Sequence, residues 1–328
     1  MKIAVLVGGT GGARFLHGVV TAFPQADISA IVNTSNDVTV HGLRVCPDLD
    51  TAMYLLGGAV DFKHPNTHPD ATQTVQAELS RYGAEASWYP LADREIATNL
   101  IRTQSLDAGY SLSEVTDALC DRWLASEGER VNVHLLPMTN ARCETHVVVD
   151  TETGPRAVHV QQWRHKNGAQ TAPRSLVQIG LDTAEPTPTV IDAITDADFV
   201  LISPGSPAFS IATILAMPRL HAALVATKAT VVGIAPVIAD AADGEHATPH
   251  GVMRSGLQAL GVSATAEAIG RHYGGRGEGG VLDFWLISMD DSADIAGVVT
   301  VSGDVEMATP ADAAVLARAA IDAASGQA

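Results

Sequence analysis

Short runs of apolar residues alternate with helical patterns near both ends of the chain. The runs IAVLV (3–7) and DISAIVN (27–33) flank a helix-like segment at 13–23, and a glycine-rich turn joins the first run to that segment. Unbroken apolar runs of this length are typical of parallel strands that are buried on both faces. The pattern therefore predicts a β-turn-α-β unit, which is the beginning of a parallel sheet.

The same alternation returns in the second half of the chain. Three more apolar runs predict buried strands, and PADAAVLARAAIDAA (310–324) predicts a closing helix, with Pro310 at the position where a missing N–H costs little. The runs are DFVLIS (198–203), TVVGIAP (230–236) and VLDFWLIS (281–288). The two ends of the chain are thus expected to build one α/β core with a mostly parallel sheet.

The middle of the chain has a different pattern. Residues 71–126 carry helical periodicity and a Ser111-x-x-Glu114 capping box, whereas residues 131–162 look like antiparallel strands around the TETG turn at 151–154. We therefore expect a single unit whose core comes from residues 1–50 and 190–328. Residues 51–189 are expected to form an inserted helical and antiparallel β region.

Composition narrows the classes of ligand. Hydrophobic residues make up 46% of the 328 residues, which is ample for a buried core, and the net charge of −17 disfavours nucleic acid as a partner. Only four of the twenty basic residues are Lys, so an anionic ligand must be held by Arg, backbone N–H groups or a metal ion. Three scattered cysteines and the lack of a long apolar stretch predict a cytoplasmic protein without a membrane partner.

The glycine-rich segment LVGGTGGAR (6–14) lies where the first strand is expected to meet a helix. Such a turn lets backbone N–H groups approach a phosphate at the positive end of the helix. A dinucleotide fingerprint would need Gly in place of Arg14 and an acidic residue in place of Asn33, and a Walker loop would need Gly-Lys-Ser/Thr. The loop therefore indicates a phosphate site of another type and weakens an NAD-dependent oxidoreductase; a tight turn without a ligand is the alternative.

Carboxylates follow the second strand. Asp37 ends the segment VNTSND, and Asp48 and Asp50 lie in PDLDT at the start of a further helix. Carboxylates beside a phosphate loop are natural Mg²⁺ ligands, because Mg²⁺ prefers oxygen donors and bridges phosphates. The alternative for each is a cap on a turn or a helix.

Two other segments carry polar groups at helix starts. Arg94 stands in the first turn of an expected helix, where its charge opposes the helix dipole, so it needs an anionic partner, either a substrate or a surface salt bridge. Ser206 and Ser210 follow a strand in SPGSPAFSI, and they can cap the next helix or donate to a nucleotide.

Together these motifs resemble the CofD/FbiA family. The resemblance rests on GGTGGAR, VNTSND, PDLDT, LADR, LLPM (135–138), SPGSP and GIAPVI, which follow in order over essentially the whole chain. It implies a Rossmann-like core, a homodimer, Mg²⁺ dependence and a transferase of substituted phosphate groups in coenzyme F-420 biosynthesis. The implied reaction moves a phosphoenolpyruvyl or 2-phospho-L-lactyl group from a guanosine diphosphate adduct, made by a partner guanylyltransferase, to the ribityl hydroxyl of the deazaflavin FO; GMP leaves.

The resemblance also assigns roles to residues. Asp50 and Arg94 match positions that contact FO, with the inserted region helping to bind it, although Ala92 stands where relatives have Gly. The chemistry of the residues themselves adds that Asp37 and Asp50 are expected to hold Mg²⁺ and to act in catalysis. Gly11 is expected where backbone approaches phosphate closely. The residues expected to bind the guanosine donor are Gly9, Thr10, Gly11, Gly12, Asn33, Ser206 and Ser210.

The sequence is also compatible with a second functional class, a regulator that binds a ligand without catalysis. Distant relatives of the YvcK type resemble nucleotide-sugar-binding regulators, but the intact PDLDT and LADR segments and the long insertion favour the transferase. The sequence does not specify the three-carbon group; few Lys with abundant Ala and Arg favour a GC-rich actinobacterium and thus enolpyruvate.

Overall fold

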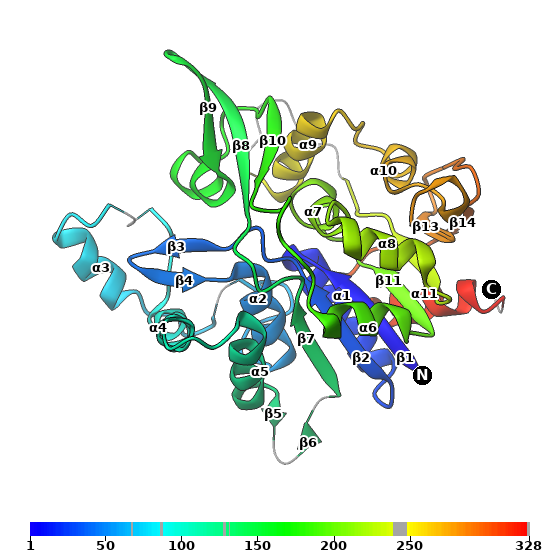
Figure 1. Ribbon diagram of the computed structural model, residues 1–328, viewed down its shortest axis with the longest axis horizontal. Helices are drawn as coiled ribbons and strands as arrows, with labels where there is room; N and C mark the ends of the chain where they lie inside the picture. The colour runs from blue at the N-terminus through cyan, green and yellow to red at the C-terminus, as the bar shows by residue number, and fades with distance from the viewer. Residues whose placement is uncertain (67, 86–87, 127–128, 131, 239–247, 327–328) are drawn as a thin grey trace.

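A parallel sheet of seven strands forms the centre of the molecule in the computed structural model (Figure 1). The structure describes residues 1–328 apart from 67, 86–87, 127–128, 131, 239–247 and 327–328. The strand order is β14-β13-β12-β11-β1-β2-β7, and each neighbouring pair is parallel. The strands are β1 (Lys2–Val7), β2 (Asp27–Val32), β7 (Val133–Pro137), β11 (Phe199–Ile202), β12 (Thr230–Ile234), β13 (Phe284–Ser288) and β14 (Val299–Gly303).

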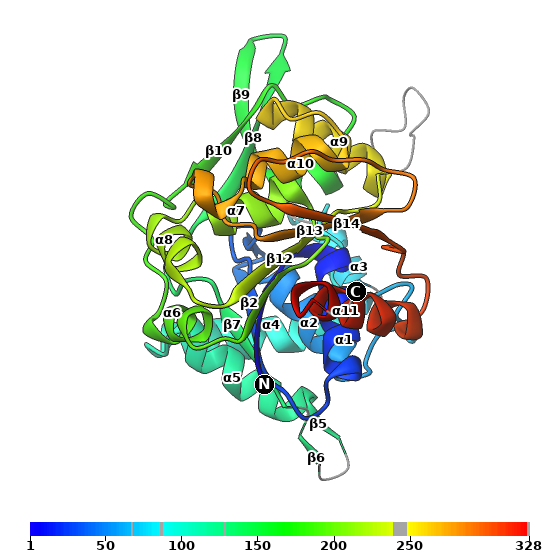
Figure 2. The ribbon, with the colours of Figure 1, turned by 90° about the vertical axis from the view of Figure 1, so that its right-hand side faces the viewer.

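Helices cover both faces of this sheet (Figure 2). They are α1 (Gly9–Ala22), α2 (Pro47–Leu56), α3 (Thr74–Arg81), α4 (Asp93–Asp107), α5 (Leu112–Trp123), α6 (Pro188–Thr195), α7 (Ala212–Leu215), α8 (Pro218–Ala226), α9 (Pro249–Leu260), α10 (Ala266–Tyr273) and α11 (Pro310–Ala324). Shorter turns are the π-helical η1 (Gln162–Lys166) and η2 (Pro207–Ile211) and the 3₁₀-helical η3 (Arg276–Glu278).

The apolar run of β1 is continuous because the strand is buried on both faces. Ile3, Val5 and Val7 enter a core shared with α1, α2, α5 and α11, whereas Ala4 and Leu6 enter a second core shared with α6, α8 and α10. The expected α/β, Rossmann-like architecture is therefore confirmed, with the sheet as the middle of three layers.

The middle of the chain corrects one expectation. Residues 131–162 do not form antiparallel strands throughout: β7 pairs with β2 in parallel and closes the edge of the main sheet. The TETG turn does join an antiparallel hairpin, β8 (Glu144–Thr151) with β9 (Gly154–His159). Apolar and polar residues alternate in β7, a pattern typical of antiparallel strands. Here the pattern arises because β7 is an edge strand that buries one face more fully than the other.

Three small sheets complete the fold. β10 (Ser175–Ile179) joins the β8–β9 hairpin to form a three-stranded sheet that stands beyond one end of the main sheet (Figures 1 and 2). The hairpin of β3 (Val38–Val40) and β4 (Leu43–Val45) was not expected; it turns at His41 and Gly42, both with positive φ, as a two-residue hairpin requires. β5 (Ala125–Ser126) pairs with β6 (Glu129–Arg130).

Within the described part of the chain, no single helix is long and apolar enough to cross a membrane. One bent pair, Pro207–Leu215 with Pro218–Ala226, reaches the required length and composition only when its two parts are taken together across a 76° bend.

Close packing of α1 against α11 predicts the effect of one glycine substitution. A Cβ at Gly18 would lie 2.3 Å from the carbonyl oxygen of Ala313, which is backbone and cannot turn away. Gly18→Ala is therefore expected to lower the free energy of unfolding by about 1–3 kcal/mol, since overpacking outweighs the higher helix propensity of Ala. Urea denaturation measures the change.

Gly277→Ala is the matched control, because its Cβ would meet nothing within 4 Å. A Gly18→Ala protein as stable as the native chain would show that α11 moves aside at little cost.

Candidate functional site

A cavity of about 620 Å³ opens at the carboxyl ends of the parallel strands, the edge where open α/β sheets bind ligands. Its walls come from the loops after β1, β11, β12 and β14, from the start of α2, and from η1 below the three-stranded sheet. Lining residues include Gly9, Thr10, Gly11, Arg14, Asp48, Asp50, Tyr89, Glu95, Arg164, Ser206, Ser210, His250, Met253 and Met307. The core and the inserted region therefore share one site.

The two glycine-containing loops after β1 and β11 interlock at the floor of the cavity. A Cβ at Gly8 would lie 2.3 Å from the Ser210 Cβ, and one at Gly205 would lie 2.5 Å from the carbonyl oxygen of Gly8. A Cβ at Gly11 would lie 2.6 Å from the carbonyl oxygen of Pro204. Position 11 therefore requires glycine because the two loops touch there. This reason is separate from the close approach to a phosphate that the sequence predicts.

The helix α1 begins inside the glycine run, four residues earlier than expected. Its N-cap, Gly8, has no side chain to accept from the first-turn N–H groups, and Thr10 and Gly11 of this turn line the cavity. Gly9 has a φ of +64°, which favours glycine. Gly12, which the sequence also assigns to the guanosine donor, faces Ser203 and Val7 and allows α1 to pack closely against them.

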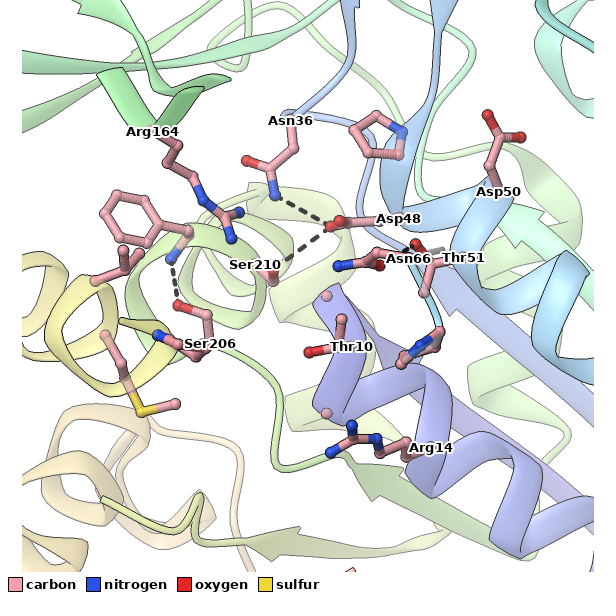
Figure 3. A pocket seen from close by; sticks show the side chains of 18 of the residues that line it. Thr10, Arg14, Asn36, Asp48, Asp50, Thr51, Asn66, Arg164, Ser206 and Ser210 are labelled. Carbon is pink, nitrogen blue, oxygen red and sulfur yellow. Dashed lines mark hydrogen bonds between the residues drawn. The ribbon is translucent and has the colours of Figure 1, made fainter. Parts of the chain in front are cut away.

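Asp48, in the first turn of α2, is the carboxylate nearest to these loops (Figure 3). Its Oδ2 accepts from Asn33 Nδ2 at 2.8 Å, from Asn36 Nδ2 at 3.1 Å and from Ser210 Oγ at 3.5 Å. Burial raises the pKa of Asp48, while the amides of Asn33 and Asn36, the charge of Arg164 and the Gly9 N–H oppose the shift. Among the described residues, the Asp48 carboxylate beside the start of α1 has no ion-pair partner.

Asn33 reaches the cavity through Asp48. It is fully buried, and its Oδ1 accepts from Ser35 N–H and Oγ–H, which orients its amide nitrogen toward Asp48. The expected contact of Asn33 with a nucleotide stays a prediction. Ser206 and Ser210 both line the cavity; the Ser206 hydroxyl accepts from Phe209 N–H at 3.3 Å and so also caps η2.

Asp50 and Asp37 each have an arginine partner. Asp50 lines the cavity, and Arg102 on α4 donates to both of its carboxylate oxygens. Burial raises the pKa of Asp50 and the charge of Arg102 lowers it, with a net rise. Asp37 is fully buried and accepts from Arg44 at 2.8 Å and from Cys46 Sγ at 2.9 Å; burial raises its pKa to about 6. Asp37 does not line the cavity.

The carboxylates decide how a magnesium ion fits. Within the described ranges, no group of three or more His, Cys, Asp or Glu side chains is placed to hold a metal ion. Asp48 and Asp50 of α2 line the cavity, and Mg²⁺ is often held by one or two carboxylates together with substrate phosphates. The cavity therefore fits a magnesium ion that comes with a phosphate ligand, and Asp48 suits it better than Asp37.

Arg94 lies apart from the other expected residues. It is exposed on α4 and does not line the cavity, while its neighbour Asp93 accepts from Thr74 N–H and Val75 N–H at the start of α3. Its assignment to FO stays a prediction.

Sequence reasoning missed several lining side chains on the inserted region, among them Tyr89, Glu95, Asn99, Arg164 and His165. The sequence offers little to find them, since they come from α4, from η1 and from the loop before α4. In the sequence, Arg14 stands out only as the residue that breaks a dinucleotide fingerprint. Its Nε donates to the carbonyl of Phe62 at 2.8 Å, so it fixes the loop that carries Asn66 into the cavity (Figure 3).

Comparison with known proteins gives a consistent result. The family described as "2-phospho-L-lactate transferase CofD" matches residues 3–317. A phosphoenolpyruvate transferase of Nocardia farcinica is 46% identical over 98% of this chain and 94% of its own, and that of Mycobacterium marinum is 44% identical over 98% of both. The crystal structure of a Bacillus halodurans protein of the UPF0052 family has the same fold, with a TM-score of 0.58 at 18% identity over 98% of this chain and 99% of its own.

The partly buried Glu95 predicts a pH dependence of stability. The pKa of Glu95 is raised to about 7. Burial is the largest cause, the hydrogen bond from the Ala92 N–H opposes it, and the negative charge of Asp50 adds to it. Because the folded chain holds this proton more tightly than the unfolded chain, the associated stability is complete below about pH 4.5 and is lost as the pH rises through 7. Between pH 4.5 and pH 7, the free energy of unfolding of the native chain should fall by about 1–3 kcal/mol relative to that of Glu95→Gln.

Urea denaturation at half-unit steps of pH measures the difference. The exposed Glu152→Gln variant serves as the control and should follow the native chain. Parallel curves for the native chain and Glu95→Gln would mean that water reaches this carboxylate freely.

Proposed function

Because the chain belongs to the CofD family of 2-phospho-L-lactate transferases, we propose that it carries a phosphoenolpyruvyl group from a guanosine diphosphate adduct to the ribityl hydroxyl of FO. The family makes the chain a phosphoenolpyruvyl or phospholactyl transferase of coenzyme F-420 biosynthesis. The nature of the donor adduct, the acceptor FO, the magnesium ion, the homodimer and the supply of donor by a guanylyltransferase belong to the proposal.

One observation carries it: Thr10 and Gly11 in the first turn of α1 and the Asp48 carboxylate line the same cavity. Backbone N–H groups at a helix start favour phosphate oxygens, and the carboxylate provides a ligand for the cation that accompanies them. Side chains of the inserted region, such as Tyr89 and Glu95, line the cavity with them and offer a surface for a second substrate.

The chemistry requires alignment and charge neutralisation more than a covalent nucleophile. The FO hydroxyl attacks the phosphorus that bears the enolpyruvyl group and releases its proton to solvent as the new P–O bond forms. The P–O bond to the second phosphate breaks, and GMP leaves with the bonding electrons. Thr10 and Gly11 would hold the phosphates through their N–H groups, while Asn33, Asn36 and Ser210 keep Asp48 in place.

Asp48 and Asp50 would hold the magnesium ion, which would neutralise charge on the phosphate oxygens when bound. Since Arg102 already occupies both oxygens of Asp50, Asp48 would contribute the larger share. Asp37, paired with Arg44 outside the cavity, would support the start of α2 through Cys46.

The relatives favour enolpyruvate as the three-carbon group. Proteins of Nocardia farcinica and of several mycobacteria that are 43–46% identical over 98% of this chain are named phosphoenolpyruvate transferases. This agrees with the composition of the chain.

Reconstitution tests the function. The chain is mixed with FO, GTP, a guanylyltransferase and either phosphoenolpyruvate or phospholactate, and the product is identified by mass. We expect the enolpyruvyl product, loss of turnover with EDTA and recovery with Mg²⁺. Tight binding of FO without any product would instead contradict the transferase, and full turnover in metal-free buffer would remove the magnesium ion from the proposal.

Asp48→Asn tests the place of the metal. The substitution keeps the size of the side chain and removes its charge, so kcat should fall by about 100-fold or more, as for the loss of a preorganised electrostatic group. Asp27→Asn is the control, because Asp27 is exposed at the opposite end of β2. An Asp48→Asn protein with native kcat and unchanged Mg²⁺ requirement would place the metal elsewhere.

A further inference from the structure

Arg164 approaches the cavity from a different direction than the phosphate loops. It lies on η1, which follows strand β9 of the three-stranded sheet, and its guanidinium points into the cavity toward Asn36 and Ser210 (Figure 3). Across the part of the chain that the structure describes, Arg164 has neither a hydrogen bond nor an ion pair. Its positive charge nevertheless acts on Asp48, whose pKa it lowers.

The other arginine in the cavity lining has less to offer. The Nε and Nη2 of Arg14 each donate to a backbone carbonyl, of Phe62 and of Lys63, so part of this guanidinium is already held by the protein. His165, next to Arg164, is neutral at pH 7, because burial and the adjacent charge lower its pKa to about 4. Of the two arginines in the described lining, Arg164 is therefore the one whose guanidinium makes no hydrogen bond to the protein.

The substrates named by the comparisons carry an anionic group that the phosphate loops do not account for. Both 2-phospho-L-lactate and phosphoenolpyruvate bear a carboxylate on the carbon that carries the phosphate. In a cavity that contains Asp48 and Asp50, a carboxylate without a cation would be repelled.

Resting on the proposed function, we propose that Arg164 binds the carboxylate of the three-carbon group and so makes the site select donors that carry one. A guanidinium presents two parallel N–H donors in a plane, which matches a carboxylate and gives bidentate hydrogen bonds. The phosphates lie at the start of α1 on the main sheet, and Arg164 reaches the adjoining carboxylate from the three-stranded sheet. A π-helical turn at this point is in keeping with the frequent occurrence of such turns at functional sites.

Two donors that differ only in this group test the assignment. One is the guanosine diphosphate adduct of phosphoenolpyruvate, and the other is its carboxamide, which has the same shape without the charge. For each, kcat/KM for transfer to FO and the dissociation constant of the donor alone are measured. The proteins are the native chain, Arg164→Ala, Arg164→Lys and the control Lys166→Ala, which alters an exposed cation on the same short helix.

The native chain and Lys166→Ala should prefer the carboxylate donor by about 10- to 100-fold, the range for a charged hydrogen bond. In Arg164→Ala the preference should fall to near unity, with the carboxamide donor affected less than about threefold, and Arg164→Lys should recover part of it. Equal losses for both donors would overturn the proposal in favour of a phosphate contact, and unchanged preference would overturn it outright.

Failure of the proposed function gives a different result. If the native chain transfers neither group to FO, the transferase proposal fails, while the dissociation constants still decide the carboxylate assignment. Discrimination in binding that depends on Arg164 supports it, and binding without discrimination in the native chain overturns it.

Discussion

The central constraint in this molecule is the burial of three carboxylates at one edge of the sheet. Asp37, Asp48 and Asp50 are all nearly inaccessible to water, where like charges repel strongly and ionisation is costly. Each is compensated differently: Asp37 by Arg44, Asp50 by Arg102 and Asp48 by the neutral donors of two asparagines and a serine. Among the described residues, only the last arrangement supplies no ion pair, and this carboxylate is the one beside the start of α1.

The support of Asp48 extends beyond the main sheet. Asn33 holds the carboxylate, Ser35 holds Asn33, and Thr145 of β8 donates to the Ser35 hydroxyl at 2.9 Å. Thr145 belongs to the three-stranded sheet whose hairpin leads to η1. The carboxylate on one wall of the cavity and the guanidinium on the other are thus positioned by one hydrogen-bonded framework, and a shift of the hairpin would move both.

Local pattern was sufficient for the parallel core, because an apolar run buried on both faces, such as β1, has few other interpretations. It failed for β7, whose pairing depends on β2, a strand about a hundred residues away, and for the pairing of Arg102 with Asp50. The motifs located Asp48 and Asp50 on one helical turn but did not tell which charge an arginine neutralises. Arg164 carries no local signal, since its place in the cavity depends on how the hairpin folds back over the main sheet.

The interlocked loops also bear on how the chain is made. Gly8 leaves the ribosome early, yet the residues it fits against, Gly205 and Ser210, follow roughly two hundred residues later, and Ala313 covers Gly18 later still. At about 5–20 residues per second, the loop after β1 is made at least ~10 s before the loop after β11 that packs against it. During that interval the buried face of α1 has no partner from the C-terminal half. A nascent chain stalled before residue 204 would therefore present apolar helix surface to chaperones rather than a partly formed binding site.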